Sequence, residues 1–280
     1  IAKSEASEAF AHAGMDATGN VWVVWQSMRA GNADVFARFI SADGELSDEI
    51  PIAVSAAGEW EPRVDFDLDG NAWVTYDSSE GNEFNVNLAK ISPNGEVKRY
   101  PIGHTSRYEA RADLASTFDG SGFWLAAERG RVRWGKDVRG HGNAKGLNAQ
   151  TEVMFGKFDI ASETFTEYPL GPAGTLGNPV NLPAVGVDAK GCPWIAYRYF
   201  KRTLWRIAVT RFDPEAKTWT QARRLPKSEF GQDRRAQFVR TIVGDELQLC
   251  WPSDLRTTKA PGESGIYFAQ LDAELELSLI

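Results

Sequence analysis

The chain has 280 residues, of which 42% are hydrophobic and 25% charged, and its formal net charge is −7. This composition is ordinary for a globular chain and supplies a full core. It contains no run of about 18 apolar residues, which excludes a membrane-spanning helix, and its acidic isoelectric point of about 5.2 argues against nucleic acid as a partner.

The most informative pattern is an internal repeat. Trp22, Trp73 and Trp124 stand 51 residues apart, each in a similar stretch such as Asp-Leu-Asp-Gly-Asn-Ala-Trp-Val-Thr-Tyr around Trp73. A fourth copy contains Trp194, and a degenerate fifth aligns Leu247 with these tryptophans. Self-similarity with a period near 50 residues indicates an array of like supersecondary units.

Each repeat predicts four β-strands. In the clearest repeat, short β-rich runs are separated by Leu-Asp-Gly, Ser-Ser-Glu-Gly-Asn and Ser-Pro-Asn-Gly, which are turn signals. The predicted strands are 8–15, 20–26, 34–41 and 47–54; 61–67, 71–77, 84–91 and 97–102; 109–116, 122–128, 151–158 and 164–169; 180–187, 192–199, 205–213 and 217–224; and 235–243, 246–252, 264–271 and 274–280.

The second strand of each repeat is apolar on both faces, as in Val21–Trp25 and Ala72–Tyr76. An antiparallel strand without a wet face must be covered on both sides, and stacking sheets around an axis supplies that cover. We therefore predict an all-β fold, a five-bladed β-propeller with four-stranded antiparallel blades, in one domain over 1–280. The expected blades are approximately 5–55, 56–103, 104–170, 171–225 and 226–280.

The Asp-x-x-Gly turns before the tryptophans have two interpretations. Asp16, Asp67 and Asp188 are suited to bonding turn amides, and the glycines that follow them, Gly19, Gly70 and Gly191, to supplying positive φ. Calcium binding is the weaker alternative, because calcium needs about six or more oxygens and each turn offers one or two. Cys192 and Cys250 are expected to face opposite sides of equivalent strands, so we predict two buried free thiols instead of a disulfide.

The largest departure from the repeat is basic. The step from Trp124 to Trp194 is 70 residues, and most of the addition lies in the segment 129–145, which holds six Arg or Lys residues against one Asp. A local positive charge in an acidic chain points to a local task, because function concentrates in loops on a rigid scaffold.

Aligned polar positions are expected to meet this segment at one mouth of the propeller. The alignment places His12, Arg63, Arg111, Ala184 and Gln237 at one inner position, and Phe10, Glu61, Glu109, Leu182 and Arg235 two residues earlier. The second strands end in Gln26, Asp77, Glu128, Arg198 and Trp251. Polar groups on inner strands must be wet or paired, so the mouth is either a ligand site or a self-neutralising Arg–Glu network.

Guanidinium forks favour carboxylate, sulfate or phosphate, so the expected guest is an anionic saccharide or another small anion. The ligand-binding candidates are His12, Arg63, Arg111, Trp134, Lys136, Asp137, Arg198, Arg235, Trp251, Asp254 and Arg256. If the chain is an enzyme, the carboxylate candidates are Glu61, Asp77, Glu109 and Glu128, since glycoside hydrolysis needs two carboxyl groups. No Gly-x-Ser-x-Gly, His-Glu-x-x-His or phosphate-cradling loop is present, and no metal or cofactor is predicted.

The Asp-x-x-Gly-Asn-x-Trp repeats resemble those of bacterial β-propellers in the sialidase-like and Trp-turn groups. The stretches Trp22–Arg38, Trp134-Gly-Lys-Asp and Trp251-Pro-Ser-Asp-Leu-Arg look like propeller modules of large secreted bacterial proteins, some of which carry a following hydrolase-like domain. A sialidase would imply an arginine triad, which Arg63, Arg111 and Arg235 could imitate, but the motif Ser-x-Asp-x-Gly-x-Thr-Trp is missing. Five-bladed glycosidases would imply acidic residues on successive inner strands, where this chain has Phe10 in its first repeat.

Three functional hypotheses follow. The first is a module that binds carbohydrate or another anionic ligand at the basic mouth and acts beside a flanking catalytic domain. The alternative is a glycoside hydrolase or polysaccharide lyase that acts on an acidic glycan with paired carboxylates at the same mouth. The third is a protein–protein platform, which predicts an apolar patch. The resemblance implies a secreted or periplasmic protein, and because the chain begins at Ile1 without a Met, we expect it to be a processed or excised segment.

Overall fold

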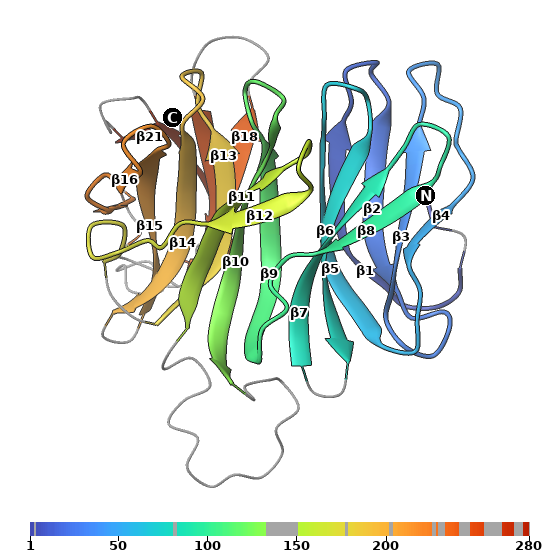
Figure 1. The fold of residues 1–280 in the computed structure, drawn as a ribbon, viewed down its shortest axis with the longest axis horizontal. Helices are drawn as coiled ribbons and strands as arrows, with labels where there is room; N and C mark the ends of the chain where they lie inside the picture. Colours follow the sequence, from blue (N-terminus) through green and yellow to red (C-terminus); the bar gives the residue numbers. More distant parts are fainter. Residues whose placement is uncertain are drawn as a thin grey trace, which may run out of the picture. The chain divides into compact units, whose positions relative to one another are not determined.

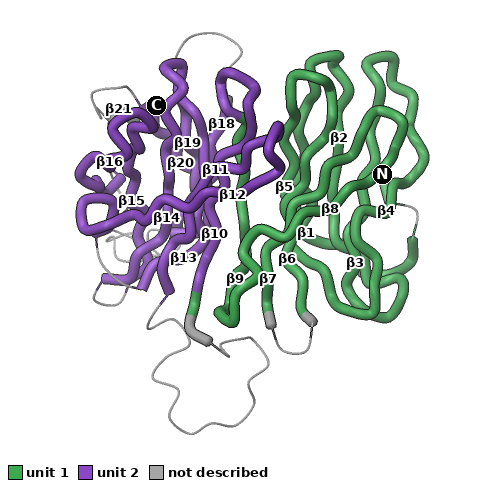
Figure 2. Tube along the Cα trace, viewed as in Figure 1, with its two compact units in different colours: residues 1–116, 130–141 green, residues 117–129, 142–280 purple. Residues whose placement is uncertain are grey.

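The computed structural model describes residues 1–2, 4–80, 83–132, 151–176, 179–201, 204–225, 228, 233–240, 247–254, 265–271 and 277–279. Two compact units make up the chain, Ile1–Ser116 with Gly130–His141 (unit 1) and Thr117–Arg129 with Gly142–Ile280 (unit 2), as Figure 2 shows. Each is described by itself, and the single domain over 1–280 stays a prediction. The described part contains no helix, and hence none that could cross a membrane.

Five small antiparallel sheets follow one another along the chain, each built from consecutive strands (Figure 1). The strands are β1 (Glu8–Met15), β2 (Val21–Ser27), β3 (Asp34–Ile40) and β4 (Ile50–Ala53); β5 (Gly58–Phe66), β6 (Ala72–Glu80), β7 (Glu83–Ile91) and β8 (Val97–Pro101); β9 (Arg107–Ser116), β10 (Gly122–Val132), β11 (Glu152–Asp159) and β12 (Thr164–Glu167); β13 (Val180–Val187), β14 (Pro193–Lys201), β15 (Leu204–Asp213), β16 (Thr218–Trp219) and β17 (Arg223–Arg224); and β18 (Gln237–Arg240), β19 (Leu247–Ser253), β20 (Gly265–Leu271) and β21 (Leu277–Leu279). The predicted fold class, a five-bladed β-propeller, is confirmed.

The fourth sheet corrects one predicted strand. The segment 217–224 forms two short strands, β16 and β17, which both pair with β15 but are out of step by one residue. Phe212 pairs with Trp219 and Val209 with Arg223, so the outer strand carries one extra residue. The main-chain N–H of Ala222 donates to the carbonyl of Ala173 at 2.7 Å, outside the ladder. A bulge of this kind interrupts pairing without ending the sheet.

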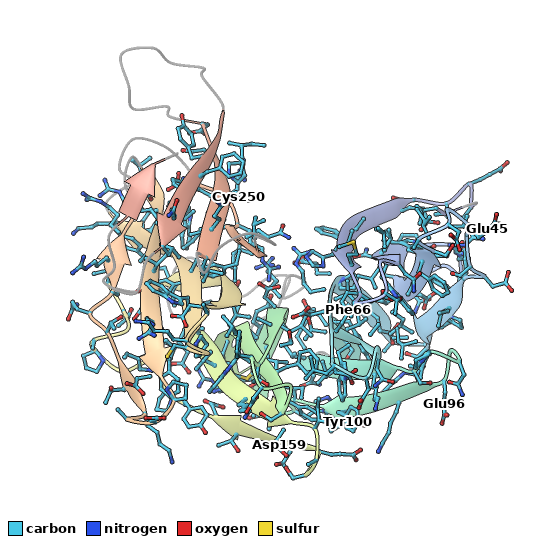
Figure 3. The ribbon with its side chains drawn as sticks, turned by 90° about the horizontal axis from the view of Figure 1, so that it is seen from above. Glu45, Phe66, Glu96, Tyr100, Asp159 and Cys250 are labelled. Atoms are coloured by element: carbon cyan, nitrogen blue, oxygen red, sulfur yellow. The ribbon has the colours of Figure 1, made fainter. Side chains whose placement is uncertain are left out.

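The core lies between neighbouring sheets. The second strands β6, β10 and β14 are covered on both faces as predicted, whereas one face of β2 and of β19 stays partly exposed. In unit 1, Trp22 and Val24 of the first sheet pack against Val64 and Val74 of the second. Phe66, labelled in Figure 3, lies 6.2 Å from Trp22 between ring centroids. In unit 2, a similar cluster joins the fourth and fifth sheets. Burial of these large side chains supplies the main driving force for stacking the sheets.

The Asp-x-x-Gly turns are structural, as their preferred interpretation predicts. In the second repeat, Asp67 accepts hydrogen bonds from the main-chain N–H groups of Asp69 and Asn71 and from the indole N–H of Trp73. The same pattern recurs at Asp16 and Asp188. Gly19, Gly70 and Gly191 have φ of 86°, 80° and 76°. Trp22, Trp73 and Trp194 are therefore each anchored by the Asp six residues before them.

Both cysteines are free, as predicted, but they are half-buried instead of buried. Burial raises the pKa of the Cys192 and Cys250 thiols. Both thiols are therefore protonated at neutral pH and act as small apolar side chains.

Candidate functional site

In four of the first strands, β1, β5, β9 and β13, one non-glycine residue adopts the left-handed conformation, and in β1, β5 and β13 it lies in a bulge. Register shifts occur between Ala9 and His12 in β1, between Trp60 and Arg63 in β5, and between Asn181 and Ala184 in β13. The residues with positive φ at these positions are Phe10 (52°), Glu61 (47°) and Leu182 (48°), and β9 has Arg111 (57°). Each such residue costs about 1–3 kcal/mol, and bulges re-aim side chains beside binding sites. The repeated strain marks this region as the candidate site.

Carboxylates from the ends of the second strands stabilise two of these bulges. The main-chain N–H of Arg111 donates to both oxygens of Asp77, at 2.7 and 2.8 Å. The main-chain N–H of Leu182 donates to Glu128 Oε2 at 3.4 Å. Asp77 is 4% exposed and Glu128 0%. Two of the carboxylates predicted as catalytic candidates therefore have a structural role, which sequence spacing alone did not reveal.

The bulges also correct the alignment of the third repeat. Arg111, and not Glu109, occupies the bulge position of Glu61, so Arg111 is not equivalent to Arg63. The cause is the turn after β9, which closes from Thr117 to Gly122, whereas the corresponding turn of the second repeat closes from Asp67 to Asn71. The third repeat thus carries one inserted residue before its Trp, whereas aligning Arg111 with Arg63 would require three.

A second column of carboxylates lies two residues before the bulges, and it is buried. Ser55 Oγ donates to Glu59 Oε1 at 2.5 Å, and Thr105 Oγ1 donates to Glu109 Oε1 at 3.0 Å. In the fifth sheet, Ser228 donates to Asp233. Glu109 is 0% exposed and belongs to this column. The missed signal was a Ser or Thr four residues before Glu59 and Glu109.

Burial affects the ionisation of Glu59 and Asp233. It raises the pKa of Glu59 above its usual value, against the hydrogen bond from Ser55. It raises the pKa of Asp233 to about 6, against the hydrogen bond from Ser228. Desolvation disfavours the charged form of a carboxyl group, so these side chains hold protons more strongly than exposed ones.

Three first strands of unit 1 bring the remaining candidates together. β1, β5 and β9 are spatial neighbours, and His12 Nδ1 on β1 accepts the main-chain N–H of Val64 on β5 at 3.2 Å. Arg111 Nε on β9 lies 3.5 Å from Glu61 Oε2 on β5. Arg63 is half-buried, and its Nη1 donates to the carbonyl of Pro62 at 3.4 Å. We name Phe10, His12, Glu61, Arg63 and Arg111 the bulge cluster.

The chemistry of the bulge cluster combines cations with an aromatic ring. The guanidinium groups of Arg63 and Arg111 stand beside the carboxylates of Glu61 and Asp77, and Phe10 is 53% exposed. Glu61 orients Arg111, while Asp77 fixes the backbone of the same residue. The Glu61–Arg111 contact is an ion pair of the self-neutralising kind. Guanidinium groups held in place in this way are suited to recognising an anion.

The candidates in unit 2 have separate environments. Arg235 Nη2 donates to the carbonyl of Pro183 at 3.0 Å, and the Arg198 guanidinium lies 4.7 Å from the Trp205 ring centroid. Asp254 is half-buried. Trp251 is 0% exposed and stacks on Tyr267 in the core, which corrects the expectation that it faces a ligand. Its position on the inward face of β19 explains the difference.

The basic segment 129–145 lies mostly outside the described residues, as do Trp134, Lys136, Asp137 and Arg256. Of its described part, Arg129 forms a two-point ion pair with Glu167, with N–O distances of 2.6 and 2.8 Å. One of the six cations of this segment is therefore neutralised within the third sheet. Among the described residues, no three His, Cys, Asp or Glu side chains gather as a metal site.

Solved structures with the same fold place the chain among β-propellers. No protein-family model and no curated protein match its sequence. A protein of unknown function from Dyadobacter fermentans is 12% identical, with a TM-score of 0.68 over 99% of this chain and 83% of that one. The endo-arabinase from Bacteroides thetaiotaomicron is 12% identical, with a TM-score of 0.56 over 92% of each chain. The Hadza microbial sialidase Hz136 is 9% identical, with a TM-score of 0.55 over 89% of this chain and 53% of that one. At these identities the likeness shows the fold.

Proposed function

We propose that the chain is a carbohydrate-binding propeller module that holds an anionic saccharide at the bulge cluster. The observation that carries the proposal is the repeated positive φ of Phe10, Glu61 and Arg111 on three neighbouring first strands. Strain of this kind persists where the surrounding structure over-determines it, and it concentrates at functional sites. The fold neighbours named as an arabinase and a sialidase support a role connected with glycans.

The arginines of the cluster support an anionic guest. The whole chain carries −7, yet the cluster brings the guanidinium groups of Arg63 and Arg111 onto neighbouring strands. A guanidinium attracts negatively charged ligands locally, and its planar fork contacts a carboxylate at two points. An acidic sugar such as galacturonate offers that group together with a ring.

Burial of the carboxylates favours binding over hydrolysis. Asp77, Glu109 and Glu128 are 4%, 0% and 0% exposed. Asp77 and Glu128 accept main-chain N–H groups, and Glu109 accepts the hydroxyl of Thr105. A general acid or base must reach the substrate within hydrogen-bond distance, directly or through one water. Of the four candidates, Glu61 is the least deeply buried and so the best able to reach a substrate, but it is paired with Arg111.

We expect trigalacturonate to bind in isothermal calorimetry and Arg63→Ala to weaken binding by about tenfold to hundredfold. A hydrogen bond to a charged group contributes about 1.5–3 kcal/mol, which corresponds to that range. The matched control is Arg99→Ala, which removes the same charge from β8, the opposite edge of the same sheet, where Arg99 is exposed. This control should bind as the unaltered protein does.

Two outcomes would overturn the proposal. The first is that the protein binds neither trigalacturonate nor any other glycan, acidic or neutral, on an array. The second is release of reducing ends from polygalacturonate that Glu61→Gln abolishes, which would establish a hydrolase or lyase instead of a binding module.

A further inference from the structure

Phe10 is the most exposed of the positive-φ residues inside the described first strands, whereas Leu182, the other apolar one, is half-buried. Glu163 and Lys217, with φ of 55° and 54°, are polar residues in turns beside short outer strands. Phe10, with φ of 52°, lies inside β1, and its ring is 53% exposed. A bulky side chain in this conformation is a genuine outlier, and an exposed aromatic ring gains nothing from the core. Fold stability therefore does not account for Phe10.

The neighbours of Phe10 suggest what it serves. His12 lies two residues along β1 and contacts the main chain of β5 at Val64, next to Arg63. β1 and β5 are neighbouring strands, and both are bulged at the equivalent residue, Phe10 in one and Glu61 in the other. The exposed ring of Phe10 therefore lies on β1, and the guanidinium group of Arg63 belongs to the neighbouring strand β5.

We propose that Phe10 is a stacking platform that makes the bulge cluster selective for hexuronate rings over simple anions. This inference rests on the proposed function and deepens it. The apolar C–H face of a pyranose ring packs on the phenyl face of Phe10, and the carboxylate of the same sugar pairs with a guanidinium of the cluster. Sites for small molecules commonly combine an aromatic surface with a few placed polar groups, and such a pair recognises ring and charge together.

The backbone conformation supplies a variant that separates binding from folding. Phe10→Gly removes the ring at a position where glycine adopts positive φ without strain. The relief of strain offsets the greater freedom of glycine in the unfolded chain, so the melting temperature should stay near that of the unaltered protein. Trigalacturonate should bind about tenfold more weakly, whereas the affinity for inorganic sulfate should not change.

Lys217→Gly is the matched control, because it makes the same backbone change at φ 54° outside the bulge cluster. It should alter neither affinity. Phe10→Trp keeps an aromatic face and should retain trigalacturonate binding. If Phe10→Gly binds trigalacturonate as the unaltered protein does while Arg63→Ala is weakened, the stacking platform is refuted and the binding module stands. If neither variant changes binding, the bulge cluster is not the site and both proposals fall.

Discussion

Replacement of Asp67 by alanine is expected to lower the free energy of unfolding by about 3 kcal/mol, measured by urea denaturation. The carboxylate of Asp67 accepts four hydrogen bonds at 2.7–3.0 Å, from Asp69, from the main chain and side chain of Asn71, and from the indole of Trp73. Trp73 is 1% exposed, so its N–H would be left buried without its acceptor. An orphaned buried donor costs about 1–3 kcal/mol, and the turn amides lose a charged partner in addition.

The control lies in the same turn. Asp69 is exposed and contributes its main-chain N–H to Asp67, so Asp69→Ala should change the free energy of unfolding by less than about 0.5 kcal/mol. Equal destabilisation by the two substitutions would contradict the role assigned to Asp67. The Asp-x-x-Gly turns would then act through turn geometry alone.

Asp233→Asn is expected to stabilise the protein at pH 8 and to have little effect on its stability at pH 4. Burial raises the pKa of Asp233 from an ordinary 3.8 to about 6 in the folded state. As pH rises from about 4 to above 6, the unfolded chain releases this proton before the folded chain does, so folding loses stability over that window. Over the whole window this lowers the free energy of unfolding by about 3 kcal/mol. Asparagine has no proton to lose, so Asp233→Asn should regain that free energy at pH 8.

Asp119, whose pKa is shifted in the opposite direction, provides the comparison. Hydrogen bonds from Ser121 lower the pKa of Asp119 to about 2, so its contribution is present at neutral pH and is lost as pH falls from about 4 through 2. Asp119→Asn should therefore destabilise the protein at pH 7, with a difference that shrinks in acid. Denaturation curves in which Asp233→Asn is less stable than the unaltered protein at pH 8 would contradict the buried-acid account.

The fold could be predicted because the same pattern of strands and turns recurs five times along the sequence. Trp22, Trp73, Trp124 and Trp194 each lie near the start of a second strand, and three of them bond to the Asp six residues earlier. Most predicted strands of the first four sheets agree with the observed ones within about three residues. Hydrophobic pattern and turn chemistry act locally, so one clear repeat was enough to interpret its neighbours.

The site could be predicted only in outline. His12, Glu61, Arg63 and Arg111 do lie on neighbouring first strands, but their register depends on bulges and on one inserted residue after β9. Side chains alternate along a strand, so an error of this size changes which residues share a position. The structural roles of Asp77 and Glu128 arise from the next sheet along the chain, and no local pattern records such partners.

The most direct test of the central claim maps the ligand onto the chain by nuclear magnetic resonance. Titrating trigalacturonate into the ¹⁵N-labelled protein should shift the amide signals of residues 10–12, 61, 63–64 and 110–112, which surround the positive-φ residues of β1, β5 and β9. The signals of the Asp-x-x-Gly turns, residues 16–20 and 67–71, should stay in place. Shifts confined to those turns, or to unit 2, would contradict a binding site at the bulge cluster.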